Sequence, residues 1–178
     1  MPQTFAPKPA NGAIEATPID AEDHWVYRHY IDGAFVESAA GESFESIDPV
    51  SGEVWAKIAR GRPADVDRAV QAASRAFAAE EWRGLSASAR AGLMRRLGDL
   101  ITENADWLAQ LEMKDNGKLI AELSMQMRYM ANYYYYYGGL ADKIQGATIP
   151  TDKPGVFNYT RNEPLGVRAC IMPCTSPL

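Results

Sequence analysis

Four consecutive residues near the end of the chain, Pro173, Cys174, Thr175 and Ser176, combine a thiol, two hydroxyls and a proline directly after an apolar run. The run, residues 165–172, is predicted to be a buried strand of a parallel sheet that the proline ends. Ligands of such folds bind beyond the carboxyl ends of the strands. The segment is therefore a candidate binding site, although an apolar run before a proline also fits an ordinary strand end.

The two cysteines are candidate nucleophiles, because a thiolate can attack a carbonyl carbon. Cys170 lies inside the predicted strand, where a small thiol is an ordinary core residue, so we expect it to be buried. Cys174 stays open between nucleophile and bystander, since no histidine or other base adjoins it in the sequence. The histidines, His24 and His29, match no zinc-ligand spacing, and we predict no metal site.

The elements that would position this segment begin with two predicted hairpins. Asp32-Gly33 supplies a turn within the strand pair 30–36, and a second pair, 44–48 and 53–59, surrounds a turn at 49–52. Pro150 and Pro154 later precede another predicted strand, 155–161. The amino-terminal and carboxyl-terminal parts of the chain are thus expected to be β-rich.

Helices fill the middle of the chain. Pro63 and an acid after it begin the first helix, and Ser86 or Ser88 caps the next, which has a joint near Asn104. Asn116-Gly117 ends that element. Apolar stripes should face the core, comprising Val66, Ala69, Val70, Ala73 and Phe77 and then Leu93, Leu97, Leu100 and Ile101.

A long helix is predicted from about 119 to 144 because this stretch has good helix formers and no proline. It carries five consecutive tyrosines, residues 133–137. Successive helical residues point about 100 degrees apart, so the five cannot form one aromatic face. We expect packing between layers for some of them and solvent for the others, rather than a platform for stacked bases.

Composition bounds the function. The chain has 178 residues, 47% of them hydrophobic, and a net charge of −5, which fits one globular domain or little more. No basic run exceeds Arg95-Arg96, so we expect no nucleic-acid partner. No apolar run has the length of a signal peptide or a membrane span, which predicts no membrane partner and a cytoplasmic location.

In addition to these patterns, several segments of the chain resemble segments of the aldehyde dehydrogenase family, in the same order along the sequence. The resemblance is carried by residues 30–33, 48–53, 115–118, 136–143, 146–150, 157–161 and 163–166, by Ile171-Met172-Pro173, and by Pro177-Leu178. It extends from Tyr30 to Leu178 and covers only the amino-terminal part of a family member. It implies a mixed α/β fold that ends in the first strand of a Rossmann-like parallel sheet.

The resemblance also implies a division of the chain into four parts. It begins at Tyr30, and the prolines at 2, 7, 9 and 18 with no long apolar run between them predict that residues 1–29 are a flexible tail. Residues 30–145 would be the hairpins and helices of the cofactor-binding domain. Residues 146–163 would hold the oligomerisation strand, through which family subunits pair as dimers or tetramers. Residues 164–178 would be the incomplete first strand and loop of the Rossmann-like sheet.

For chemistry, the resemblance implies oxidation of an aldehyde to an acid with NAD or NADP, through a cysteine thiohemiacetal and a thioester. Ile171, Met172, Pro173 and Cys174 would then adjoin the cofactor, with Cys174 standing where the family has a tryptophan. Thr175 stands where the family has the asparagine that helps hold the oxyanion. Its hydroxyl can donate a hydrogen bond, but it is shorter than a carboxamide and differently aimed.

The family's nucleophilic cysteine and general-base glutamate lie beyond the matched region, so we expect the chain alone to be inactive. The alternative is a non-catalytic partner that pairs with a full-length homologue through residues 155–161 by β-augmentation. A third hypothesis is an independent helical binding module built on residues 119–144. Asp115 is interpreted as a helix-terminal acid rather than a ligand of the monovalent cation that family members often hold nearby.

Overall fold

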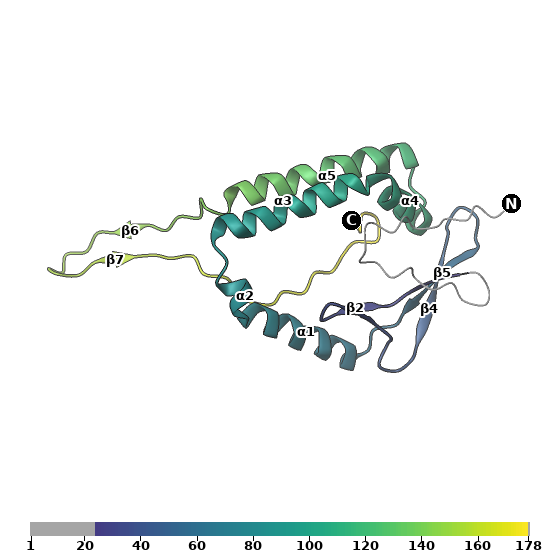
Figure 1. Cartoon of the computed structure of the whole chain (residues 1–178), viewed down its shortest axis with the longest axis horizontal. Helices are drawn as coiled ribbons and strands as arrows, with labels where there is room; N and C mark the ends of the chain where they lie inside the picture. The colour runs from purple at the N-terminus through teal and green to yellow at the C-terminus, as the bar shows by residue number, and fades with distance from the viewer. Residues whose placement is uncertain (1–23, 178) are drawn as a thin grey trace.

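The computed structural model describes residues 24–177, in which strands and helices alternate in blocks (Figure 1). The amino-terminal block contains β1 (Trp25–Tyr27), β2 (His29–Ile31), β3 (Ala34–Val36), β4 (Ser43–Ile47) and β5 (Val54–Ala59). The helices are α1 (Pro63–Ala78), α2 (Glu80–Arg83), α3 (Ala87–Glu103), α4 (Ala105–Asn116) and α5 (Ile120–Leu140). Two short strands follow, β6 (Thr148–Ile149) and β7 (Asn158–Tyr159).

Both predicted hairpins are present. β2 and β3 pair antiparallel around Asp32 and Gly33, whose φ angles of 57° and 79° are both left-handed, as a two-residue hairpin turn requires. β4 and β5 also pair antiparallel, and β1 joins β5 in parallel to give the order β1-β5-β4. The two hairpins therefore belong to separate sheets.

Strand β1 corrects the predicted tail at its carboxyl-terminal end. Residues 1–23 lie outside the described part of the chain, but Trp25–Tyr27 forms a strand in which Trp25 lies opposite Ala56. Tyr27 packs edge-on against Trp55, with ring centroids 5.9 Å apart, and its burial raises the pKa of the phenol to about 12. Because residues 25–27 pair with β5, they are not part of a flexible tail.

Most of the predicted helix ends are found in the structure. Pro63 begins α1, the Ser86 hydroxyl accepts from the Ala89 amide at 3.1 Å, and Asn104 joins α3 to α4. Gly117 ends α4 with a φ of 74°. The long helix is shorter than predicted, because α5 stops at Leu140 just after two consecutive glycines, which favour the helix weakly.

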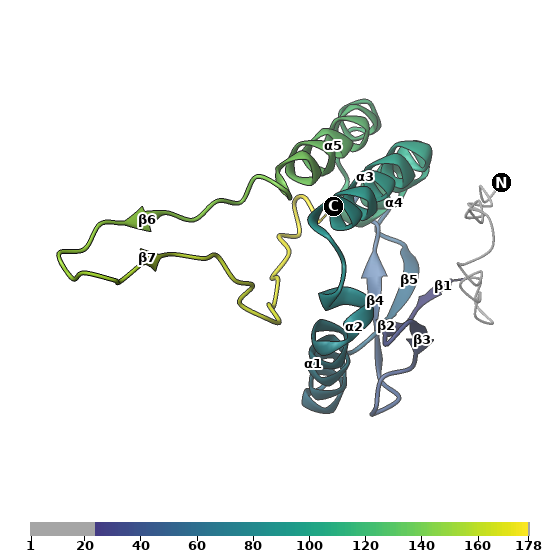
Figure 2. The ribbon, with the colours of Figure 1, turned by 60° about the vertical axis from the view of Figure 1, so that its left-hand side comes forward.

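Small residues bring α3 and α5 close together, and the two helices run side by side in both views (Figures 1 and 2). A Cβ added to Gly98 would lie 2.7 Å from a ring carbon of Tyr135, and one on Gly138 would lie 3.3 Å from the Ala91 carbonyl oxygen. The core between α4 and α5 is likewise compact, comprising Ala105, Ala109, Leu123 and Met127. Glycine therefore lets α3 and α5 approach each other, while Leu123 and Met127 fill the core between α4 and α5.

The predicted apolar stripes do not face this core. Val66 and Val70 of α1 are 58% and 47% exposed, and Leu93 and Leu97 of α3 are 53% and 43% exposed. The residues of these helices that are buried lie on other faces, namely Asp65 and Ala72 in α1 and Ala91 and Gly98 in α3. Among the tyrosines, Tyr134 is half-buried and the other four are exposed, so packing buries less of the run than we expected.

Beyond α5 the chain extends away from the body as a long arm that carries β6 and β7 (Figure 2). Only Asn158–Tyr159 of the predicted strand 155–161 pairs, with Thr148–Ile149 opposite. The predicted strand at residues 165–172 is not formed in this structure. No strand in the described part of the chain lies beside it to complete a ladder, and a strand needs such a partner for its backbone groups.

One buried carboxylate links the start of α1 to the loop between β3 and β4. Asp65 accepts from the backbone amides of Arg62 and Ala39 at 3.0 and 2.9 Å, and its side chain is 4% exposed. The Arg62 amide above all lowers the pKa of Asp65, although burial opposes the shift. The charged form is therefore the one that the fold stabilises.

We predict that Asp65 makes the fold sensitive to acid. Because its pKa is lower in the folded than in the unfolded chain, its contribution is complete above a pH of about 4 and is lost as the pH falls through the folded pKa. Asp65→Asn should lower the melting temperature at pH 7 and flatten its acid dependence. Asp67→Asn, at an exposed position of the same turn, is the control and should do neither.

A second prediction concerns glycine. Gly117→Ala should destabilise the fold by about 1–2 kcal/mol, because an L-residue strains the left-handed backbone. Its Cβ would also lie 2.9 Å from the Pro49 ring. Gly92→Ala, in open space within α3, should instead stabilise by about 0.5–1 kcal/mol. Urea unfolding of both variants measures the difference, and equal effects would contradict the strained geometry.

Candidate functional site

The predicted site residues form a short exposed turn. The Ser176 amide donates to the Pro173 carbonyl oxygen at 3.3 Å, which closes a turn containing Cys174 and Thr175. Ile171 and Met172, directly before it, are 98% and 58% exposed. The expected cofactor-side residues are thus contiguous, and their side chains are open to solvent.

Cys170 departs from the prediction. We expected a buried core thiol, but Cys170 and Cys174 are both free and exposed. The reason is the unpaired course of residues 165–172, since burial of Cys170 depended on a strand within a sheet. Neither thiol has a hydrogen bond or ion pair in the described structure that would mark it as an activated nucleophile.

The turn is attached to the junction between α4 and α5. Lys118 Nζ donates to Ser176 Oγ at 2.6 Å, and Ser176 Oγ donates to the Thr175 carbonyl oxygen at 2.7 Å. Lys118 also pairs with Glu112 Oε1 at 3.2 Å. The attachment joins residues that are 58 positions apart in the sequence.

Glu112 is a buried acid that the sequence reasoning did not single out. Its side chain is 1% exposed, and Oε1 accepts from both Lys118 and Asn116, the latter at 3.1 Å. Oε2 has no hydrogen-bond partner among the described residues. The sequence did contain one indication that Glu112 is buried, because it follows Ala105 and Ala109 at helical spacing on the same side of α4.

The same junction receives the turn between β4 and β5. Asp48 accepts from Lys114 Nζ at 2.9 Å and from the Val50 amide at 2.8 Å. The hydrogen bond from Lys114, followed by that from Val50, lowers the pKa of Asp48. Lys114, in the last turn of α4, therefore binds an acid at the start of the β4–β5 turn.

Asp115 fits its interpretation as a helix-terminal acid. Its Oδ1 accepts from the Ser46 hydroxyl at 2.9 Å, which adds another contact between β4 and α4. Across residues 24–177, no three histidine, cysteine, aspartate or glutamate side chains gather in a way that could hold a metal ion. The described residues also include no helix with the length and apolar character needed to cross a membrane.

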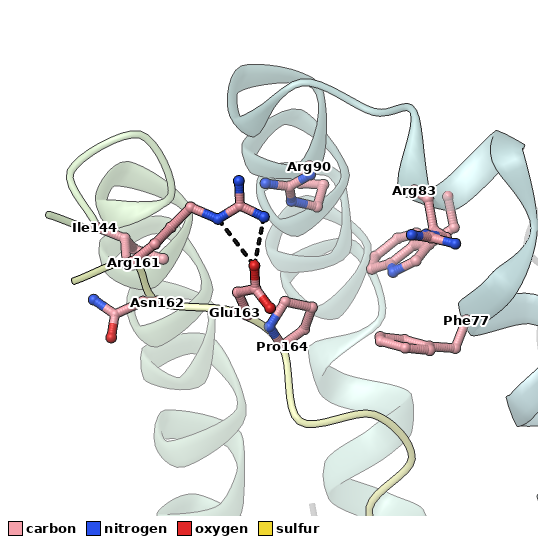
Figure 3. Close-up of a pocket in the computed structure, with 9 residues that line it drawn as sticks. Phe77, Arg83, Arg90, Ile144, Arg161, Asn162, Glu163 and Pro164 are labelled. Atoms are coloured by element: carbon pink, nitrogen blue, oxygen red, sulfur yellow. Dashed lines mark hydrogen bonds and ion pairs between the residues drawn. The ribbon is translucent and has the colours of Figure 1, made fainter. Parts of the chain in front are cut away.

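A separate hollow lies between α1, α2, α3 and the segment that returns from the arm (Figure 3). Its volume is about 930 Å³, and Phe77, Trp82, Arg83 and Arg90 line one side. Across it, the Arg161 guanidinium donates to Glu163 through two nitrogens. None of the predicted site residues lines this cavity, so it is separate from the turn.

Solved structures share the fold of this chain. An NAD+ complex of the aldehyde dehydrogenase from Bacillus cereus is 38% identical with a TM-score of 0.74, and the match covers 78% of this chain and 28% of that one. Betaine aldehyde dehydrogenase from Staphylococcus aureus, in an apo form, is 37% identical with a TM-score of 0.70, over 74% of this chain and 26% of that one. The chain therefore shares its mixed α/β fold with part of each of these solved structures.

The sequence comparison is more specific. The profile of the aldehyde dehydrogenase family matches residues 35–178, and the chain belongs to that family. A dehydrogenase of Acinetobacter baylyi that acts on (Z)-2-((N-methylformamido)methylene)-5-hydroxybutyrolactone is 48% identical over 152 residues, 85% of this chain and 31% of that protein. A mitochondrial aldehyde dehydrogenase of Arabidopsis thaliana, family 2 member B4, is 42% identical over 83% of this chain and 28% of that protein.

The chain thus spans about a third of the length of these relatives, from 28% to 31% in the two compared. Within that span, the resemblance from Tyr30 onward is confirmed as family membership. The mixed α/β fold is confirmed by the solved structures.

The exposed cysteines lead to a direct prediction. Because both thiols are accessible, the native chain should react with a thiol reagent at two sites without denaturant. Cys170→Ser should reduce the count to one, and unfolding of the unmodified chain should not raise it above two. A single reactive thiol in the native chain, with the second revealed only by denaturant, would restore the buried strand that we first predicted.

Proposed function

We propose that the chain is the amino-terminal part of an NAD(P)-dependent aldehyde dehydrogenase and contributes one wall of its cofactor site. The observation that supports this most is the family match over residues 35–178, which includes the segment Ile171-Met172-Pro173. The NAD+ complex of the Bacillus cereus relative supports NAD or NADP as the cofactor. The substrate class is an aldehyde, oxidised to a carboxylic acid.

The residues before and within the turn suit a cofactor wall in chemical terms. Ile171 and Met172 offer exposed apolar surface against which a planar ring could lie. The backbone of the 173–176 turn adds accessible polar groups at the same edge. When bound, the cofactor would accept the hydride, which none of this chain's side chains can do.

Thr175 takes the role of oxyanion donor in this proposal. Its hydroxyl lies in the exposed turn next to Cys174, and no described hydrogen bond occupies it. A hydroxyl aimed at a developing oxyanion stabilises the transition state, although its reach is shorter than that of a carboxamide. Cys174 would adjoin the cofactor rather than attack the aldehyde, because no base accompanies its thiol.

The nucleophile and the general base have no counterpart among residues 24–177, so the chain would not complete the reaction alone. A cytoplasmic location and pairing of subunits through the β6–β7 arm complete the proposal. The arm suits pairing because it stands away from the body and leaves Phe157 and Tyr159 75% and 61% exposed (Figure 1).

That exposed arm also favours the alternative, a non-catalytic partner of a full-length homologue. An extended arm with a two-residue ladder has free backbone groups along most of its length, which can add to another chain's sheet. Both proposals use the same surface. They differ in whether residues 171–175 ever contribute to turnover.

We predict that the purified chain shows no aldehyde-dependent formation of NADH or NADPH, measured by absorbance. A chimera that continues after Leu178 with the matching remainder of the Acinetobacter baylyi relative should be active. In it, Thr175→Asn should raise kcat by up to about 10²-fold, because a better oxyanion donor is restored.

Two results would change this assignment. Turnover by the chain alone that disappears in Cys174→Ser would make Cys174 the nucleophile. An inactive but folded chimera, together with co-elution of the chain with the full-length relative, would favour the partner function.

A further inference from the structure

We infer that Lys118 is the positioning residue of the 173–176 turn, and that the buried Glu112 carboxylate holds Lys118 in place for this task. The inference rests on the proposed function in one respect only, namely that the turn adjoins the cofactor. The positioning itself is a property of contacts within residues 112–176.

Lys118 is the described residue whose side chain ties the turn to the helices. Its ammonium lies 2.6 Å from Ser176 Oγ, at the last position of the turn. The Ser176 hydroxyl donates a hydrogen bond to the Thr175 carbonyl oxygen at 2.7 Å, so it accepts from Lys118 and donates within the turn. One side chain thereby orients the peptide group that follows Thr175.

Lys118 is itself fixed at three points. Its ammonium pairs with Glu112 Oε1 at 3.2 Å, and its backbone amide donates to Asn116 Oδ1 at 3.1 Å. Gly117, immediately before it, has the left-handed conformation that turns the chain from α4 into α5. A lysine on a free surface would sample many rotamers, whereas this one is restrained from both ends.

The buried acid explains why the restraint is strong. Glu112 is 1% exposed, and a carboxylate with so little water needs a cation beside it. Lys118, with a side chain that is 26% exposed, reaches from that acid to the surface turn. Charge neutralisation in the interior therefore sets where the ammonium lies, and the ammonium sets where the turn lies.

The identity of residue 176 matters to this arrangement. A hydroxyl can accept a hydrogen bond from an ammonium and donate one to a carbonyl oxygen at the same time. Alanine would abolish both bonds, and threonine would keep them. Residue 176 thus offers a way to release the turn without disturbing the Glu112–Lys118 pair.

The experiment is ¹⁵N relaxation on the 178-residue chain, which reports backbone order at Thr175 and Ser176. In the unmodified chain, the order parameters should be near the rigid value of about 0.85, and Ser176→Ala should lower those of residues 174–176 below about 0.6. Ser176→Thr should keep the unmodified values. The melting temperature should not change in either variant, because the interior pair is intact.

Lys118→Met should loosen the turn equally and also lower the melting temperature, since it leaves Glu112 unpaired. The double change Glu112→Gln with Lys118→Met removes that unpaired charge, so its turn should be loose while part of the stability returns. Adding Ser176→Ala to Lys118→Met should loosen the turn no further. Lys153→Met, on the exposed arm, is the matched control and should change neither quantity.

Unchanged order parameters in Ser176→Ala would overturn the inference, as would loosening that is equally large in Lys153→Met. Cofactor binding is measured separately by titrating NAD+ into each variant. If the turn loosens as expected but the chain binds no NAD+, Lys118 remains the positioning residue. The same result would count against the proposal that the turn adjoins the cofactor. Weaker binding in Ser176→Ala than in Ser176→Thr would support both.

Discussion

The left-handed backbone at Gly117 determines where three parts of the molecule meet. It ends α4, redirects the chain into α5 and leaves no room for a side chain, because a Cβ there would touch the Pro49 ring at 2.9 Å. The β4–β5 turn lies against this point, and Lys114 on one side of it pairs with Asp48. Lys118 on the other side reaches the 173–176 turn. A single conformational constraint therefore brings the amino-terminal sheet and the candidate site to the same helix junction.

Buried acids complete this organisation at the ends of elements. Asp48, Asp65 and Glu112 are the described acids with the least exposure, and each accepts hydrogen bonds from groups that come from elsewhere in the fold or from a turn. Acids at such positions specify loop geometry, because the charge is stable only when its partners are in place. The apolar core is small by comparison, with Leu123 and Met127 as its largest fully buried side chains.

Local patterns in the sequence were sufficient to predict much of this fold. Asp32-Gly33, Ser86 and Gly117 each determine backbone geometry through their own chemistry, and the structure has a turn or a cap at each. Turns and helix caps depend on residues that are neighbours in the sequence, so they can be predicted without a structure.

What could not be predicted depends on partners that are distant in the sequence. The apolar run at 165–172 has the composition of a strand, yet composition cannot say whether a neighbouring strand lies beside it. The stripe with Leu93 and Leu97 has helical spacing, but the contact between α3 and α5 uses Gly98 and Gly138 instead. At the candidate site, the resemblance to the family was sufficient to indicate residues 171–175. The support from Glu112 and Lys118 required the fold.

The parallel pairing of β1 with β5 has a consequence for how this molecule assembles. Strand β5 can form its hairpin with β4 by local closure, whereas Trp25–Tyr27 must find Ala56 across an intervening stretch that contains a second hairpin. Closing the longer loop costs more chain entropy and offers only three paired residues in return. The cost of loop closure therefore favours formation of the β4–β5 hairpin before β1 pairs with β5.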